Sequence, residues 1–456
     1  MFKEFDWVTE ILSKHTLISK LSSGCKSRHD WKIGTEHEKF GFKKKDLSPI
    51  SFEDIQRIFA ELIENYNWLA VKENEKIVEL RKNSASITLE PGGQIELSGA
   101  PMENLFQTCK EVNLHQDELN NVCSKYDIDF MGIGVLPKWN LNDLKLMPKE
   151  RYKIMSNYMP KVGEKGLDMM MRTTTIQANF DFSSEKDMVR KLRVSQSIQP
   201  LVIALYANSP FIDGKLTEYL SYRSYIWTKT DPSRCGILPF IYEEDFSFER
   251  YVDYLLEVPM YFIIRDKKYI DLTGYTFKAF LEKKIIKKYE PELKDWDIHI
   301  TTVFPEVRLK SFIELRGVDG GPWSRVCALP AFWTGILYDN NVLNEVSELV
   351  SDWTFNDIQN LYDNVRKYGL KTHMPGGEKL TEFTKKILNL SSTGLRNRKI
   401  EFSGKNEETF LEPLRKILSQ GDSPAEIWKN LYINQWSKDI NMLYKNNYFK
   451  VTNDQT

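Results

Sequence analysis

The sequence predicts an α+β protein, and two observations carry that prediction. Strand-like runs alternate with amphipathic helices between about residues 31 and 320, and the helical period dominates from about residue 339 onward. The 456 residues contain no internal repeat, low-complexity run or linker rich in Pro, Gly or Ser that would separate independent domains. We therefore expect one unit, with a core in residues 1–338 and a helical C-terminal layer, residues 339–456, packed on it.

Two helices can be placed from their capping residues. The first follows Ser51, with Asp54 three residues on, and its apolar face consists of residues 55, 58, 59, 62 and 63. The second follows Thr354 and Asp357, and Gly369 would end it. Both are typical of packing helices.

The most clearly predicted strand covers residues 173–182. Its odd-numbered positions are polar, and its even-numbered positions are apolar apart from Thr174. Such alternation is typical of a strand that packs one face on a core and offers the other to a ligand, or simply to water. Gln177 and Asn179 lie on the polar face, and both interpretations stay open.

Acidic residues recur on three further strand-like runs. Glu36 and Glu38 project from one face of a strand, about 7 Å apart, where like charges repel unless a cation lies between them. Glu96 lies on a second run, and the Pro-Gly-Gly turn sets Glu90 just across a tight bend. Glu314 lies on a third. Acids on separate strands suit a Mg²⁺ site on the floor of a sheet, because Mg²⁺ prefers oxygen ligands, and solvated strand faces are the alternative.

Arginines accompany these acids. Glu314 shares a strand face with Arg316, and further candidates for anion recognition are Arg151, Arg172, Arg223 and Arg308. The chain has neither a P-loop motif nor a complete GxGxxG, so a phosphate site would have to rest on metal ions and arginines. His37 points away from the glutamates on either side of it and is interpreted as a packing residue.

Charge and hydropathy exclude several classes of partner. Lys and Arg number 63 against 64 Asp and Glu, a formal charge of −1, whereas nucleic-acid affinity rests on a basic excess. No stretch approaches the roughly 20 apolar residues of a membrane span. The acidic Glu4 and Asp6 are unlike the start of a secretory signal or a transit peptide. We expect a cytoplasmic protein that binds neither nucleic acid nor membranes, as a monomer or a homodimer.

Seven segments, taken together and in order, closely resemble the plant and alphaproteobacterial type of glutamate–cysteine ligase, also called γ-glutamylcysteine synthetase. The resemblance runs from about residue 24 to at least 340 and rests on WKIGTEHEKFGF, LEPGGQIELSGAP, KVGEKGLDMMMRTTTIQANFDFSSE, ALYANSPF, SYRSYIWTKTDPSRCGILPF, VDYLLEVPMYF and TTVFPEVRLKSFIELRGVDGGPWSRVCALPAFW. It implies a glutamine-synthetase-like catalytic core, in which a curved antiparallel sheet lined by metal-binding acids is flanked by helices.

The resemblance also implies the reaction. ATP would phosphorylate the γ-carboxylate of L-glutamate, and the amino group of L-cysteine would displace phosphate to give γ-glutamylcysteine, the first step of glutathione biosynthesis. Mg²⁺ would be the cofactor. Two alternatives stay open: a ligase of the same fold that uses another amine, and a non-catalytic relative that binds amino acid or nucleotide.

Individual residues match the family's functional positions. Five glutamates match metal ligands: Glu36, Glu38, Glu90, Glu96 and Glu314. Glu38, Glu314 and Arg316 are the expected catalytic residues, Arg316 steadying the phosphoryl oxygens. The expected substrate-binding residues are Arg223 at the glutamate α-carboxylate, Arg151, Gln177, Asn179 and, in the cysteine pocket, Tyr261.

The cysteines follow the plant pattern in part. The resemblance implies that Cys109 and Cys327 match one of two regulatory disulfide pairs, while Leu272 and Lys287 stand where the other pair would be. One bridge can therefore form on oxidation. The alternative is a pair of buried thiols.

Overall fold

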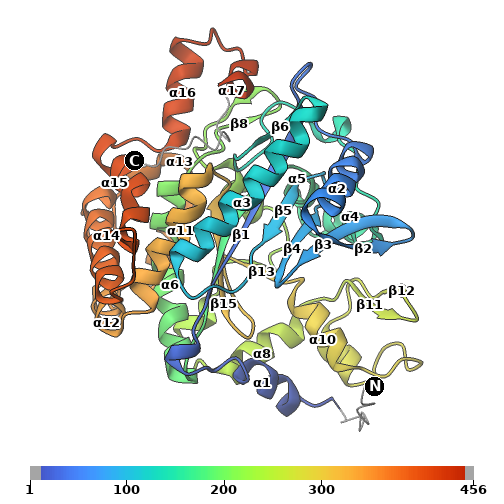
Figure 1. Ribbon diagram of the computed structural model, residues 1–456. Coiled ribbons are helices and arrows are strands. Elements are labelled where there is room, and N and C mark those ends of the chain that lie inside the picture. The colour runs from blue at the N-terminus through green and yellow to red at the C-terminus, as the bar shows by residue number, and fades with distance from the viewer. Residues whose placement is uncertain (1–11, 447–456) are drawn as a thin grey trace.

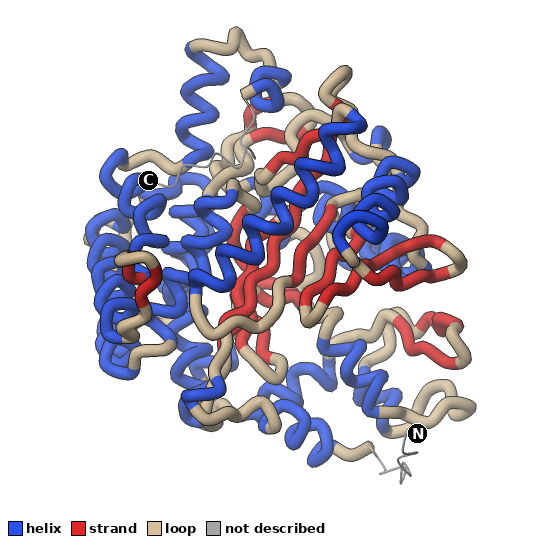
Figure 2. Tube along the Cα trace, in the orientation of Figure 1, coloured by secondary structure: helices blue, strands red, loops and turns tan. Residues whose placement is uncertain are grey.

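The computed structural model describes residues 12–446 and is built around one large antiparallel sheet. Its strands run in the order β14-β15-β7-β1-β5-β4-β3-β2, and β6 pairs with the far end of β1. Figure 2 shows this sheet at the centre of the molecule, with helices on both sides. The strands are β1 (Ile33–Lys43), β2 (Leu69–Glu73), β3 (Lys76–Lys82), β4 (Ala85–Leu89), β5 (Ile95–Ser98), β6 (Ile128–Met131), β7 (Thr175–Phe180), β14 (Val307–Leu309) and β15 (Ile313–Asp319).

Within residues 12–446, four small two-stranded sheets lie outside the large sheet. They pair β8 (Phe211–Ile212) with β9 (Lys215–Leu216), β10 (Cys235–Gly236) with β13 (Phe304–Pro305), β11 (Phe262–Arg265) with β12 (Lys268–Asp271), and β16 (Glu401–Phe402) with β17 (Lys405–Asn406).

Helices of the first 338 residues surround the sheet (Figure 1). They are α1 (Lys14–Ser22), α2 (Phe52–Tyr66), α3 (Leu105–Cys123), α4 (Glu150–Val162), α5 (Gly166–Arg172), α6 (Glu185–Tyr206), α7 (Tyr222–Thr228), α8 (Phe248–Glu257), α9 (Phe277–Leu281), α10 (Leu293–Ile300) and α11 (Trp323–Leu337). Within residues 12–446, no helix combines the length and apolar character needed to cross a bilayer.

From residue 339 to residue 446 the regular elements are helices apart from the short β16–β17 hairpin. Its helices are α12 (Asn340–Leu349), α13 (Phe355–Tyr368), α14 (Leu380–Asn397), α15 (Glu412–Gln420), α16 (Pro424–Asn434) and α17 (Asn441–Lys445). Helix α14 packs on α11, and α13 packs on α6, so this layer rests on the helices that cover the sheet. The domain boundary at residue 338 stays a prediction.

The apolar face of the central strands forms the main core. Ile176, Ala178 and Phe180 of β7 are fully buried in the core cluster to which α6 and α11 also contribute. Since side chains alternate along a strand, the polar residues of β7 face the opposite side. His37 of β1 is 1% exposed, and its ring packs 5.6 Å from that of His115, which confirms its packing role.

The predicted helix ends are confirmed. Ser51 and Asp54 form a reciprocal capping box at the start of α2, and Thr354 and Asp357 form another at the start of α13. Helix α13 ends at Gly369, whose φ of 51° favours glycine. The predicted strand 173–182 is shorter in the structure, where β7 covers Thr175–Phe180.

Candidate active site

Three glutamates of β1 and β5 lie near a fourth, Glu90, in the turn between β4 and β5. Glu38 lies directly opposite Glu96 in the β1–β5 ladder, and Glu36 precedes it by two residues on the same face. The hydroxyl group of Thr88 donates to both Glu90, at 3.0 Å, and Glu96, at 2.9 Å. Glu36, Glu38, Glu90 and Glu96 therefore lie in one region of the fold, and their role as metal ligands stays a prediction.

A tight turn fixes the position of Glu90. The backbone N–H of Gly93 donates to the carbonyl group of Glu90 at 3.0 Å, and that of Glu90 donates to the carbonyl group of Gln94 at 2.9 Å. Gly93 has a φ of 88°, which glycine adopts without strain. At Gly92 a Cβ atom would lie 2.1 Å from the carbonyl oxygen of Met171, so no side chain fits there.

Two of these carboxyl groups, Glu38 and Glu96, lie where their ionised forms are disfavoured. Burial, and then the charge of Glu90, raise the pKa of Glu38 to about 8, although Arg223 and Arg316 oppose the shift. Burial and the neighbouring glutamates, Glu90 first, raise the pKa of Glu96 well above its usual range. A site in which carboxylates resist ionisation is one that an added cation would stabilise.

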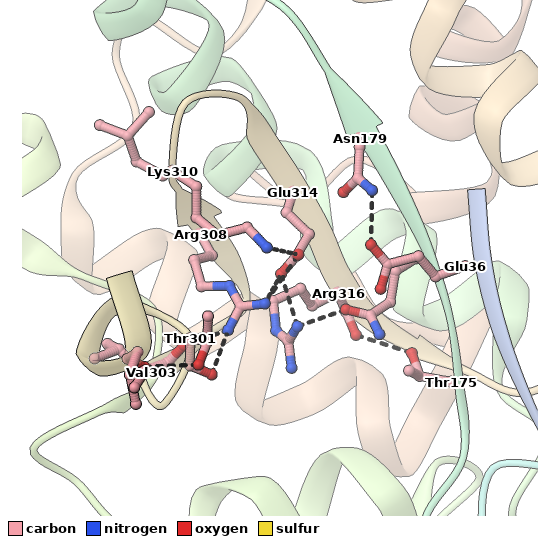
Figure 3. A network of polar contacts seen from close by, with 12 residues as sticks. Glu36, Thr175, Asn179, Thr301, Val303, Arg308, Lys310, Glu314 and Arg316 are labelled. Atoms are coloured by element: carbon pink, nitrogen blue, oxygen red, sulfur yellow. Dashed lines mark hydrogen bonds and ion pairs between the residues drawn. The ribbon is translucent and has the colours of Figure 1, made fainter. Parts of the chain in front are cut away.

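Residues of β7 connect these acids to β15. The amide group of Asn179 donates to Glu36 at 2.7 Å, and the guanidinium of Arg316 donates to Gln177 at 2.5 Å (Figure 3). The backbone N–H of Thr175 donates to Glu38 at 3.0 Å. The polar face of β7 is thus bonded to Glu36, Glu38 and Arg316, while the substrate-binding roles of Gln177 and Asn179 stay predictions.

Glu314 lies apart from the other acids, in a cluster of positive charge. Its carboxylate is fully buried and contacts Arg308 at 2.6 Å, Arg316 at 2.7 Å and Lys310 at 3.0 Å (Figure 3). Burial by itself would raise its pKa, but the three cations hold it well below its usual range. Glu314 therefore anchors basic side chains in this structure.

A bulge in β15 aims Arg316 into the site. The β7–β15 register slips between Leu315 and Val318, so Arg316 and Gly317 are accommodated outside the regular ladder. The carbonyl group of Arg316 accepts hydrogen bonds from Thr175 Oγ1 and Arg223 Nη2, both at 3.0 Å. Arg316 thereby fixes a second arginine of the site.

Arg223 is the buried cation of the site. It lies on α7, whose N-cap residue is Ser221, and is 2% exposed. Its Nε atom is buried without a hydrogen-bond partner. Burial lowers its pKa, while Asp319, Glu306 and Glu38 counteract the shift. An arginine with an unused donor and no carboxylate in direct contact is suited to an anionic ligand.

A cavity of about 120 Å³ lies beside part of this cluster and is not lined by Glu36, Glu96, Gln177, Asn179 or Glu314. Five charged residues that the sequence singled out line it: Glu38, Glu90, Arg151, Arg223 and Arg316. The remaining wall is largely apolar or aromatic: Tyr152, Met155, Met169, Met170, Trp227 and Phe304. Sequence reasoning missed this second group, although Tyr152 adjoins Arg151, and Trp227 follows Arg223 by four residues on a helix.

Tyr261 does not line the cavity. Its ring packs edge-on against that of Tyr158, its hydroxyl group is 3.5 Å from the sulfur of Met159, and the guanidinium of Arg234 lies 4.2 Å from its ring centre. It is 1% exposed. The structure gives it a core position, and its role towards cysteine stays a prediction.

Cys109 of α3 and Cys327 of α11 lie side by side beneath the surface. Both are buried free thiols, and they are close enough to share a hydrogen bond. Burial, and then the bond with Cys327, raise the pKa of Cys109 well above its usual range. Their proximity permits a bridge, but the redox pairing stays a prediction.

The residues present fit a magnesium ion by their chemistry. They supply carboxylate oxygens in a region of excess negative charge, although in residues 12–446 no three His, Cys, Asp or Glu side chains converge as a ready-made metal cage. A cage of that kind is not needed, because Mg²⁺ is usually held by one or two carboxylates together with substrate phosphates.

Comparisons with known proteins identify the class and then the family. The chain matches the family model for glutamate–cysteine ligase family 2 over residues 32–446. It is 49% identical over 440 residues to glutamate–cysteine ligase B, chloroplastic, of Oryza sativa subsp. japonica, covering 96% of this chain and 88% of the relative. The chloroplastic enzyme of Medicago truncatula is 49% identical over 438 residues, covering 96% and 85%. The protein is therefore an enzyme of the ligase class. It belongs to the glutamate–cysteine ligase family.

A solved structure supports the fold. The crystal structure of glutamate–cysteine ligase from Francisella tularensis in complex with AMP matches with a TM-score of 0.52 and 13% sequence identity. The superposed region covers 93% of this chain and 90% of the Francisella chain. The predicted glutamine-synthetase-like α+β fold, with an antiparallel sheet flanked by helices, is confirmed. The predicted family and enzyme class are confirmed as well.

The predicted cytoplasmic location is contradicted. The plant relatives, which are about half identical to this chain, are named chloroplastic enzymes and not cytoplasmic ones. The expectation rested on Glu4 and Asp6, which lie outside the described residues.

Proposed function

We propose that this enzyme joins the γ-carboxylate of L-glutamate to the amino group of L-cysteine, using ATP and Mg²⁺, as the first step of glutathione biosynthesis. One observation carries the proposal: Glu38 of β1 and Glu90 of the turn after β4 line a single cavity together with arginines of α4, α7 and β15. The names of the plant relatives and the AMP of the solved Francisella enzyme support the choice of substrates.

The arginines are proposed to bind the anionic groups of the substrates. Arg223 has an unused buried donor and suits the α-carboxylate of glutamate. Arg316 carries positive charge next to Glu38 and suits the phosphoryl oxygens as they gain negative charge. Arg151 lines the same cavity on α4 and serves a second substrate anion.

The acids are proposed to hold the metal. One or two carboxylates among Glu36, Glu38, Glu90 and Glu96 would supply its protein oxygen ligands, and Asn179 and Thr175 keep the side chains of Glu36 and Glu38 in place. When bound, Mg²⁺ neutralises the charge that accumulates on the transferred phosphoryl group. For Glu314 we infer a positioning role through Arg316 in place of a metal contact, since cations already surround it.

The reaction proceeds in two displacements. A γ-carboxylate oxygen of glutamate forms a bond to the γ-phosphorus of ATP, and the bond to ADP breaks. The amine of cysteine then attacks the acyl carbon, phosphate leaves, and the amine loses a proton. The apolar wall that includes Met155, Trp227 and Phe304 limits the access of water to the acyl phosphate, which would otherwise hydrolyse.

The proposal is tested by measuring phosphate release from ATP and Mg²⁺ with glutamate, adding L-cysteine or other amines in turn. We expect rapid release that requires both amino acids, with γ-glutamylcysteine as the product in mass spectra. Equal rates with unrelated amines would redirect the proposal to another acceptor. No amine-dependent release would reject it.

A further inference from the structure

Glu306 is a buried carboxylate behind the active site to which no function has been given above. It lies between β13 and β14 and is 5% exposed. Its backbone N–H donates to the carbonyl group of Gly236 at 2.9 Å, and its own carbonyl group accepts from the backbone N–H of Arg316 at 3.0 Å. Its main chain is therefore bonded directly to the bulge of β15.

The side chain of Glu306 packs against the same bulge. A Cβ atom at Gly317 would lie 1.8 Å from Oε2 of Glu306 and 2.4 Å from Nε2 of Gln199. Gly317 thus leaves the space that the carboxylate occupies. The bulge that aims Arg316 and the Glu306 side chain form one tightly packed arrangement.

Helix α13 of the C-terminal layer holds this carboxylate. The hydroxyl group of Tyr362, which is 1% exposed, donates to Oε1 of Glu306 at 2.6 Å. Oε2 is buried without a hydrogen-bond partner, so among residues 12–446 Tyr362 supplies the one side-chain hydrogen bond to the carboxylate. Losing it would leave a buried carboxylate free to turn.

The same helix also fixes the start of α7. The carbonyl group of Arg366, one turn beyond Tyr362, accepts hydrogen bonds from the backbone N–H groups of Leu220, at 2.8 Å, and Ser221, at 3.1 Å. Ser221 is the N-cap of the helix that carries Arg223. One face of α13 therefore contacts the supports of both Arg223 and Arg316.

We propose that Glu306, held by Tyr362 of α13, is a positioning residue that keeps Arg316 and Arg223 in their substrate-binding geometry, so that the C-terminal layer sets the affinity for glutamate. The electrostatic interactions between Glu306 and the two arginines support this role. Arg223 and Arg316 both lower the pKa of Glu306 against the effect of burial, and Glu306 is among the acids that favour the charged form of Arg223. The inference rests on the proposed function.

The test compares two conservative variants of buried tyrosines. Tyr362→Phe removes the hydrogen bond to Glu306. The matched control is Tyr206→Phe, which also removes one buried hydroxyl group, bonded to the carbonyl group of Arg325 at 3.2 Å. We expect Tyr362→Phe to raise the KM for glutamate about tenfold or more, as for one lost hydrogen bond to a charged group, with the KM for ATP changed less. The control should leave both KM values unchanged at a similar loss of thermal stability.

Variants of Glu306 separate positioning from mere packing. Glu306→Ala should raise the KM for glutamate at least as much as Tyr362→Phe, and Glu306→Gln, which keeps the shape and an acceptor for Tyr362, should recover most of the loss. A Tyr362→Phe enzyme with the KM of the control, or a Glu306→Gln enzyme no better than Glu306→Ala, overturns the inference. Wild-type protein without glutamate-dependent turnover overturns the proposed function instead, so the two failures are distinguishable.

Discussion

Replacing Glu314 by Gln tests whether this residue is a metal ligand or a charge that holds arginines. The variant keeps the shape of the side chain but removes the negative charge that faces Arg308, Lys310 and Arg316 at 2.6 to 3.0 Å. Three positive charges would then lie together without their counter-charge. We therefore expect a large loss of stability as well as of activity.

The expected loss of stability can be worked out from the burial of Glu314 and its cationic partners. One pair of unit charges about 4 Å apart is worth about 4 kcal/mol at an effective dielectric constant of 20, and removing one partner of a buried ion pair typically costs about 3–5 kcal/mol. Glu314 is fully buried, so solvent does not weaken its contacts. We expect Glu314→Gln to lower the free energy of unfolding by about 3–5 kcal/mol.

The pH dependence gives an independent check. The folded pKa of Glu314 lies below the unfolded value of about 4.3, so the unfolded state binds the proton more readily. The stability it supplies is complete above about pH 4.3 and is lost as pH falls towards the folded pKa. The difference between wild type and Glu314→Gln should therefore shrink in acid.

The assay is urea unfolding of both proteins without metal or substrate, with Glu38→Gln as the control. Glu38 faces other acids, so its loss should not lower stability. If Glu314→Gln unfolds within about 1 kcal/mol of wild type, the range of an exposed pair, then the cationic cluster does not depend on Glu314 and our reasoning is refuted.

Three further predictions concern the site and the thiols. The folded pKa of Glu38, about 8, exceeds the unfolded value of about 4.3, so ionised Glu38 costs stability as pH rises through this range. In EDTA at pH 8, Glu38→Gln should therefore have a higher melting temperature than wild type, and adding Mg²⁺ should raise its melting temperature less. Equal increases with Mg²⁺ in both proteins would exclude Glu38 from the metal site. Arg223→Ala should raise the KM for glutamate about tenfold or more with that for ATP little changed, and an effect on ATP alone would reverse its assignment. After oxidation, non-reducing mass mapping should find Cys109 bridged to Cys327, with the slow reaction expected of a buried thiol of raised pKa; two free thiols would end that hypothesis.

Much of the site could be read from the sequence because it depends on local periodicity. Glu36 and Glu38 share a strand face in any extended segment, and so do Glu314 and Arg316. The capping pairs of α2 and α13 are also local, since their hydrogen bonds join residues three positions apart. These predictions needed no knowledge of what lies nearby in space.

The electrostatic environment of Glu314 could not be predicted from local periodicity. Its strand position resembles that of Glu38, yet its electrostatics are opposite, because β15 is flanked by β14, which carries Arg308, while β1 is flanked by β5, which carries Glu96. Neighbouring strands decide whether a buried carboxylate meets cations or other acids. The same holds for Tyr261, whose aromatic and cationic neighbours enclose it in the core.

The sequence by itself determined which residues share a face, where the clearest helices begin and end, and, through its ordered motifs, the family. Only the tertiary structure decided which of those faces meet. Tyr362 reaches Glu306 across 56 positions of sequence, and Arg316 reaches Gln177 across 139. Contacts of that range follow from how strands and helices pack, and packing optimises the burial of the whole core, which no local pattern specifies.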